Sequence, residues 1–140
     1  MSINKHRKAM FVLGFCVILF ITMYVVFCKR TAGVHEPTLL LISSSEARVK
    51  INENKDAFIL DVRTSEEFNM GRIPGAVNIP YLMIAEEQGL LPHDKQHLIF
   101  VYCRTGRRAE TAAYELVALG YTNIVVFPGM MTWIYETVTD

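Results

Sequence analysis

Residues 97–120 read HLIFVYCRTGRRAETAAYELVALG and contain the strongest strand signal in the chain. The first six residues of this stretch predict a strand that ends at Cys103. From Ala109 onward, small and apolar residues recur at helical spacing, and Gly120 is a typical helix stop. The stretch therefore predicts a strand and a helix joined by a short loop that begins at Cys103.

The same alternation of strand-like and helical stretches extends on both sides of this unit. Residues 57–60 are a continuous apolar run ending in Asp61, as in a parallel strand that is buried on both faces. Capping boxes, in which a serine or threonine precedes a glutamate by three residues, predict helices that begin at Ser43 and Thr64. These helices are expected to end near Asn52 and Gly71; further strands are predicted at 39–42, 76–79 and 124–127, and further helices at 81–88 and around Trp133.

Strands that alternate with helices about five times predict an α/β fold. We expect an open parallel sheet flanked by helices on both faces. In such sheets, sites gather where the carboxyl ends of strands lead into helix N-termini. Asp61 and Cys103 both follow predicted strands, so their surroundings are where a site is expected.

The loop at residues 103–108 combines two unusual features. Backbone N–H groups at a helix N-terminus have no partner within the helix, and they stabilise a cysteine thiolate and increase its nucleophilicity. Three arginines, Arg104, Arg107 and Arg108, lie at the positive end of the helix dipole, where acidic residues are normally preferred. A bound anion would relieve this arrangement. The loop therefore predicts a nucleophilic Cys103 that acts on an anionic substrate.

Each feature alone has a simpler structural explanation. A cysteine at the end of a core strand is often only a small buried hydrophobic residue, and arginines beside it often form a solvated loop. Their combination around Gly106, which allows a tight turn, favours catalysis. His93 and His97 span a loop and a strand start without further ligands at suitable spacing, so no metal site is predicted.

These motifs resemble those of the single-domain rhodaneses, a family of sulfurtransferases. Residues 71–80 (GRIPGAVNIP) are similar to the family pattern GHIPGAINIP, and residues 103–108 (CRTGRR) resemble its active-site loop. The resemblance runs from about Ile42 to Glu136. Its other motifs, in the order of the family, are Asp61-Val62-Arg63, Glu67-Phe68, and Gly129 with Trp133.

The resemblance implies a catalytic cysteine, here Cys103. It would take a sulfane sulfur from an anionic donor such as thiosulfate, hold it as a persulfide and pass it to cyanide or a thiol. The backbone amides of residues 104–108 would hold the sulfur anion, and the arginines would attract the donor. No metal and no organic cofactor is expected. The substrate-binding residues implied are Arg104, Thr105, Gly106, Arg107 and Arg108.

Related phosphatases and arsenate reductases have C-x5-R loops, in which the seventh residue is an arginine that grips a tetrahedral oxyanion. Here the seventh residue is Ala109, and the shorter loop suits a single sulfur atom. Sulfur transfer is therefore preferred over phosphoryl transfer. Asp61 and Arg63 are interpreted as structural: Asp61 as a cap for loop amides, and Arg63 as the partner of a nearby acid. Glu67 is interpreted first as a helix cap.

The N-terminal part of the chain differs in composition. Residues 9–28 contain no charged residue, and a helix of that length spans about 30 Å, the thickness of a bilayer's hydrocarbon core. A cleaved signal peptide would have a shorter apolar region, followed directly by small residues. We therefore expect a basic flank at 1–8, a single transmembrane helix at 9–28, a linker at 29–38 and a rhodanese-like domain at 39–140.

The charges of the chain bear on topology and on partners. Residues 1–8 carry three lysines and arginines, against two directly after the apolar run, which favours a cytoplasmic N-terminus and a domain outside the cytosol. Residues 31–140 hold nine basic and all fourteen acidic residues, so no nucleic-acid partner is expected. Two of the three cysteines lie in the apolar run, so no disulfide framework is predicted.

Three functions remain open from the sequence. The first is a membrane-anchored sulfurtransferase that uses Cys103. The second is a non-catalytic rhodanese-like module that docks a partner at the membrane. The third is a persulfide relay that one protein loads and another discharges; the identity of a protein acceptor stays open. The domain has no second cysteine to resolve Cys103, which argues against a disulfide oxidoreductase.

Overall fold

The computed structural model describes residues 18–25 and 36–139, and its domain is built on one parallel sheet. The sheet has five strands in the order β1-β5-β4-β2-β3, so the strand that ends in Cys103 lies at its centre. All neighbouring strands are parallel. The strands are β1 (Thr38–Leu41), β2 (Phe58–Asp61), β3 (Val77–Asn78), β4 (Ile99–Cys103) and β5 (Asn123–Gly129).

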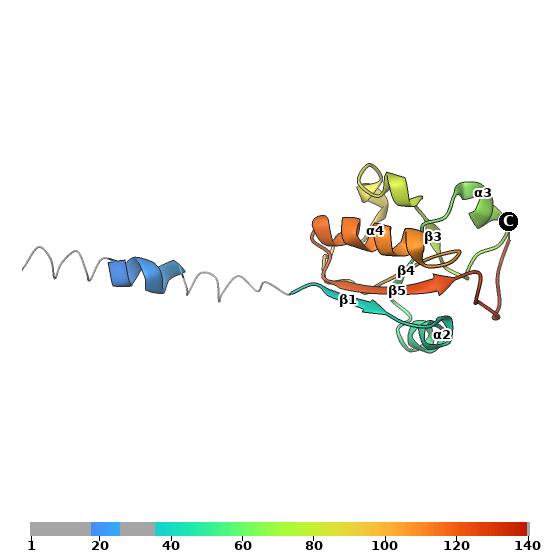
Figure 1. Cartoon of the computed structure of the whole chain (residues 1–140), viewed down its shortest axis with the longest axis horizontal. Coiled ribbons are helices and arrows are strands. Elements are labelled where there is room, and N and C mark those ends of the chain that lie inside the picture. The colour runs from blue at the N-terminus through green and yellow to red at the C-terminus, as the bar shows by residue number, and fades with distance from the viewer. Residues whose placement is uncertain (1–17, 26–35, 140) are drawn as a thin grey trace, which may run out of the picture. The chain divides into compact units, whose positions relative to one another are not determined.

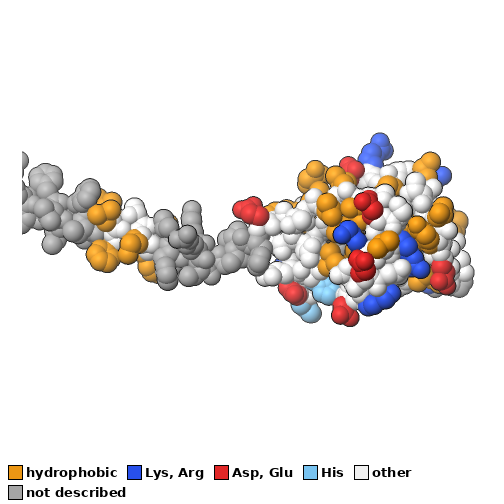
Figure 2. All heavy atoms as spheres, turned by 90° about the horizontal axis from the view of Figure 1, so that it is seen from below, with side chains coloured by type: hydrophobic (Ala, Val, Ile, Leu, Met, Phe, Trp, Pro, Cys, Tyr) orange, Lys and Arg blue, Asp and Glu red, His pale blue; other side chains and the backbone are white. Residues whose placement is uncertain are grey.

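Helices cover both faces of the sheet, as the sequence predicts. α2 (Ser44–Glu53) lies on one face, and α4 (Arg107–Ala118) lies on the other (Figure 1). α3 (Ser65–Asn69) follows β2. Both predicted capping boxes are present, at the starts of α2 and α3. Figure 2 views the domain from the α2 side, where acidic, basic and apolar side chains are intermixed.

The central strand β4 is buried along its whole length and separates two apolar clusters. On one face, small side chains let α4 approach the sheet closely; the buried ones are Ala109, Ala112, Ala113 and Leu116. On the other face, aromatic residues pack beneath α2, and these include Phe100, Tyr102, Phe127 and Trp133. Because close-packed layers hold both sides of β4, the position of Cys103 at its end is fixed.

Two predicted helices are absent from the structure. Residues 81–88 do not form one helix; instead, two single 3₁₀ turns, η1 (Tyr81–Met83) and η2 (Gln88–Leu90), flank the buried Ile84. Leu82 and Met83 beside it are exposed, so the segment has no continuous apolar face to stabilise a longer helix.

The segment after β5 is a turn and an extended stretch, not the predicted final helix. Its polar groups find tertiary partners: Val138 exchanges two backbone hydrogen bonds with Arg72, and the Trp133 indole donates to the Glu136 carbonyl at 3.1 Å. The segment is also rich in β-branched and aromatic residues, which have low helix propensity.

The predicted transmembrane segment lies mostly outside the described residues. Within it, residues 18–25 are helical and have exposed side chains. Across residues 18–25 and 36–139, we find no helix that combines the length and the apolar character needed to cross a bilayer.

Candidate active site

Cys103 is the last residue of β4, and its side chain is fully buried. Three loop residues separate it from the start of α4. The backbone N–H of Gly106, the N-cap residue of α4, donates to Cys103 Sγ at 3.1 Å. Gly106 has a φ of +100°, a conformation that L side chains rarely adopt. The loop therefore curls back on the sulfur, and the N-terminus of α4 lies beside it.

The end of β5 holds the loop from the opposite side. The register between β4 and β5 shifts after Tyr102, which pairs with Phe127, whereas Cys103 pairs with Gly129. Beyond this bulge, the N–H of Met130 donates to the Cys103 carbonyl at 3.1 Å. The N–H of the next residue, Met131, donates to the Arg104 carbonyl at 2.9 Å. The two residues that follow β5 therefore hold the carbonyl groups of Cys103 and Arg104 in place by backbone hydrogen bonds.

The three arginines of the loop have different surroundings. Arg104 and Arg107 are exposed, but Arg108 is half-buried. The two terminal guanidinium nitrogens of Arg108 donate to the two carboxylate oxygens of Glu67, at 2.6 and 2.8 Å. The hydrogen bonds from Arg108 lower the pKa of Glu67 to about 2. Hydrogen bonding to Glu67, and to a smaller extent the charge of Cys103, raises the pKa of Arg108.

Asp61 and Arg63 form a buried network at the end of β2. Arg63 donates from its backbone N–H to Asp61 at 2.9 Å and from its guanidinium at 2.6 to 3.0 Å. Its Nη2 also reaches the Gly71 carbonyl at 2.7 Å. The Asn78 amide donates to the Asp61 and Arg63 carbonyls. These bonds fix the loop that leads into α3, and thereby the position of Glu67.

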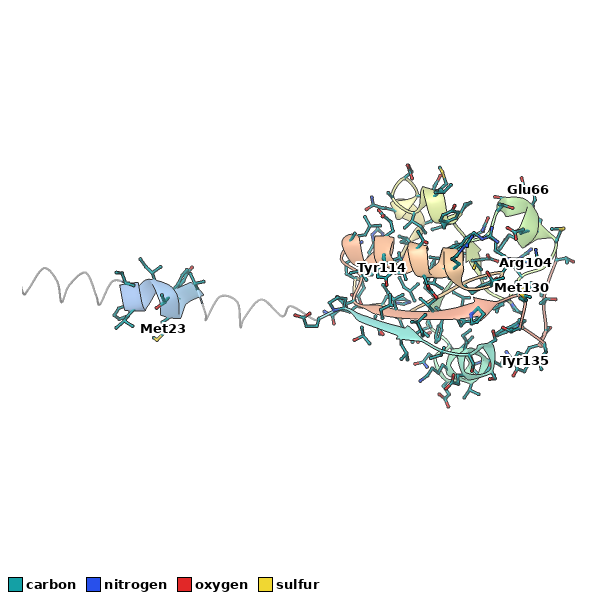
Figure 3. All side chains as sticks on the ribbon, in the orientation of Figure 1. Met23, Glu66, Arg104, Tyr114, Met130 and Tyr135 are labelled. Atoms are coloured by element: carbon teal, nitrogen blue, oxygen red, sulfur yellow. The ribbon has the colours of Figure 1, made fainter. Side chains whose placement is uncertain are left out.

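A groove of about 580 Å³ lies beside the loop. Figure 3 labels two of its residues, Arg104 and Met130, at the end of the sheet where β4 and β5 finish. Its other lining residues are Arg63, Glu67, Met70, Gly71, Met131 and Thr137. Sequence reasoning missed the three methionines, since they come from two separate segments and form no motif. It also gave no signal that Glu67 pairs with Arg108, which lies 41 residues away.

Comparisons with known proteins decide the family. The family model described as "Rhodanese-like domain" matches residues 43–136. The chain belongs to the rhodanese-like family. This rhodanese-like protein is 35% identical over 96 residues to the putative sulfurtransferase YtwF of Bacillus subtilis, and the alignment covers 69% of this chain and 91% of the relative. It is 33% identical to the putative sulfur carrier protein YrkF of the same organism, covering 69% of this chain but only 51% of the relative.

Solved structures agree with this assignment. A rhodanese-like domain protein from Staphylococcus aureus superposes with a TM-score of 0.63 and 31% identity, covering 72% of this chain and 98% of that one. A structure titled "rhodanese with anions from E. coli" gives a TM-score of 0.55 with 28% identity, covering 60% of this chain and 99% of that one. Membership of this family supports sulfur transfer as the general activity.

The described residues contain no group of three or more histidine, cysteine, aspartate or glutamate side chains that could hold a metal ion. His97, one of the two histidines considered from the sequence, has its Nε2 hydrogen-bonded to the Asp56 carbonyl at 2.9 Å. His97 lies before β4, whereas Cys103 ends that strand, so the two are at opposite ends of the sheet.

Proposed function

We propose that this protein is a sulfurtransferase that carries a sulfane sulfur on Cys103. The Cys103 thiolate attacks the outer sulfur of a donor such as thiosulfate; the donor S–S bond breaks, and its electron pair leaves with sulfite. A new S–S bond forms on Cys103, and the negative charge resides on the outer sulfur of the persulfide. Cyanide or a thiolate then attacks that sulfur, and the electron pair of the broken bond returns to Cys103.

The observation that carries this proposal is the hydrogen bond from the Gly106 N–H to Cys103 Sγ, at 3.1 Å, at the N-terminus of α4. Unpaired amides and the helix dipole stabilise a negative charge at this point. The thiolate and the persulfide anion both place such a charge there. Since the stabilising groups belong to the backbone, the nucleophile needs no adjacent histidine as a base.

The loop arginines support an anionic donor. Arg104 and Arg107 are exposed, and Arg104 also lines the groove beside the loop that begins at Cys103. In a domain whose residues 31–140 carry a net charge of −5, these two side chains create a local positive region at the site. Such a region concentrates anions near the nucleophile.

A second candidate function is the partner-loaded persulfide relay. It is favoured by the groove, whose volume of about 580 Å³ lies in the range of sites for drug-sized ligands and far exceeds what thiosulfate or cyanide needs. Two of the methionines that line it, Met70 and Met131, are 75% and 69% exposed. Exposed methionines are common on surfaces that bind varied partners. A docking module without chemistry has no comparable support, because it needs no hydrogen-bonded cysteine at a helix start.

We further propose that residues 9–28 anchor the protein in a membrane by a single helix, with residues 1–8 on the cytoplasmic side and the domain outside the cytosol. The support is the uncharged run itself, with basic residues at both ends and three of them in the N-terminal flank. Protease protection in sealed membrane vesicles tests this orientation. The domain should be protected from added protease in vesicles whose lumen corresponds to the non-cytosolic side, and it should be digested in vesicles of the opposite orientation.

The function is tested with the purified full-length chain, thiosulfate and cyanide. We expect release of sulfite, formation of thiocyanate, and an intact mass increased by one sulfur atom when cyanide is omitted. The Cys103→Ser variant is the control and should show none of these. A persulfide that forms without turnover would favour the relay. If no sulfane donor yields a persulfide or a product, sulfur transfer through Cys103 is wrong.

A further inference from the structure

The ion pair between Glu67 and Arg108 joins two helices next to the nucleophile. Glu67 lies in the first turn of α3, and Arg108 lies in the first turn of α4, directly after the Cys103 loop. The contact is bidentate, with N–O distances of 2.6 and 2.8 Å, and about a quarter of each side chain is exposed. This geometry fixes the guanidinium and neutralises it within the site.

The cation of the pair interacts with Cys103 directly, and the anion acts through it. After Glu67, the charge of Cys103 and a hydrogen bond to it also contribute to raising the pKa of Arg108. Because hydrogen bonds from Arg108 hold the pKa of Glu67 near 2, Glu67 stays ionised at neutral pH. The site thus holds a permanent anion beside its half-buried cation.

Glu67 has a second role that must be separated from this one. Its backbone N–H and its carboxylate complete the capping box with Thr64, at 3.3 and 3.2 Å. Glutamine also serves at this position of a capping box. The charge of Glu67 can therefore be removed while the start of α3 is preserved.

We propose that Glu67 is a specificity-determining residue: by neutralising Arg108, it reduces the preference of the Cys103 site for dianionic sulfur donors over monoanionic ones. This inference rests on the proposed sulfur transfer. Among the described residues, Arg104 and Arg107 have no ion-pair partner, so they remain as the cations that a donor meets. A dianion gains twice the Coulomb energy of a monoanion from each added positive charge, so the charge of the pair sets the ratio between the two donor classes.

Two donors that differ in charge but share their chemistry make this measurable. The Cys103 thiolate takes the outer sulfur of thiosulfate, a dianion, and releases sulfite. It takes the outer sulfur of methanethiosulfonate, a monoanion, and releases methanesulfinate. In both cases one S–S bond forms, one breaks, and the electron pair leaves with the oxygenated sulfur. The readout is the ratio of the two second-order rate constants for persulfide formation, followed by intact mass in single turnovers of the full-length chain.

In the Glu67→Gln variant, we expect the thiosulfate-to-methanethiosulfonate ratio to rise about threefold to tenfold at low ionic strength. This gain should shrink as added salt screens the charges. The double variant Glu67→Gln with Arg108→Gln replaces a neutral pair by another neutral pair, so its ratio should return to the wild-type value. Arg108→Gln alone leaves Glu67 unpaired, and its ratio should fall below wild type.

The matched control is Glu66→Gln. Glu66 is the neighbouring residue in the same helical turn and is exposed (Figure 3), and no ion pair involves it among the described residues. Its substitution should leave the ratio unchanged. A purely structural role of Glu67 would slow both donors equally, and an unchanged or lower ratio in Glu67→Gln would overturn the proposal. If that variant does not fold, an unchanged ratio in Arg108→Gln overturns it equally. A wild-type chain that takes sulfur from neither donor would refute the proposed function, and this inference with it.

Discussion

Gly129 passes the carbonyl of Cys103 so closely that no side chain fits between them. A Cβ atom at Gly129 would lie 2.5 Å from the Cys103 carbonyl oxygen and 2.7 Å from the Tyr102 ring. The φ of Gly129 is +82°, and the β4–β5 register shifts at this point. The end of β5 therefore fixes the backbone of the nucleophile, in addition to the N-terminus of α4.

The Gly129→Ala substitution should destabilise the domain by about 3 kcal/mol or more, because the added methyl group collides with fixed backbone and the positive φ is strained. Urea unfolding measures this loss. Gly120→Ala is the control: Gly120 has a φ of +92°, but nothing lies within 4 Å of its Cβ position, so the cost should be about 1 kcal/mol. Equal effects of the two substitutions would show that strain alone, without the close approach, matters at Gly129.

The buried pair Asp61–Arg63 should be a second point of sensitivity. Arg63 is only 5% exposed, and Asp61→Asn leaves its guanidinium without a charged partner, so we expect a loss of about 3 kcal/mol in the free energy of unfolding. Asp56→Asn makes the same chemical change at an exposed turn and should cost less than about 0.5 kcal/mol. Thermal and urea unfolding of both variants provide the comparison. A small loss for Asp61→Asn would mean that the Gly71 carbonyl alone satisfies Arg63.

The sequence predicts the sheet and its two capped helices well because local signals and burial agree there. Strand β4 is apolar throughout since both of its faces are covered, and the capping boxes at Ser43 and Thr64 need only residues three positions apart. The placement of Cys103 between a strand and a helix follows from the same local signals.

What the sequence does not predict depends on contacts between distant segments. The stretch after β5 lacks a helix since its backbone bonds to Arg72 and its indole packs on Phe127, at 5.9 Å between ring centroids. Similarly, the three loop arginines look equivalent in the sequence. In the structure, Arg108 forms an ion pair with Glu67 of α3, whereas the other two arginines are exposed. Such pairings arise only when the chain is folded.

The Glu67–Arg108 pair should make stability depend on pH in a defined window. The pKa of Glu67 is lowered in the folded state, from 4.5 to about 2, by hydrogen bonds from Arg108. A depressed carboxylate pKa contributes stability that is fully present above the unfolded value and is lost as the pH falls towards the folded one. The pair should therefore contribute on the order of 1 kcal/mol, after solvent screening, above about pH 5 and progressively less towards pH 2.

Urea unfolding of wild type and Glu67→Gln at pH 7, 5, 4 and 3 checks this window. The difference in unfolding free energy should be constant between pH 7 and 5 and should shrink at pH 4 and 3. A difference that persists undiminished at pH 3 would show that the glutamine weakens the capping box, and not the ion pair. The measurement needs no substrate, so it stands apart from the donor experiment.

The two exposed loop arginines should differ in their effect on donor loading. Arg104 lines the groove, whereas Arg107 lies in the first turn of α4 and is not among the residues lining it. Arg104→Ala should therefore reduce the rate constant for persulfide formation from thiosulfate about threefold to tenfold, and Arg107→Ala should reduce it less. In both variants the rate should become less sensitive to ionic strength, since one steering charge is lost. If Arg107→Ala reduced this rate constant more than Arg104→Ala, the donor would approach from the other side of the loop. On that side, a hollow of about 270 Å³ is lined by Thr105, Gly106 and Pro128 among other residues.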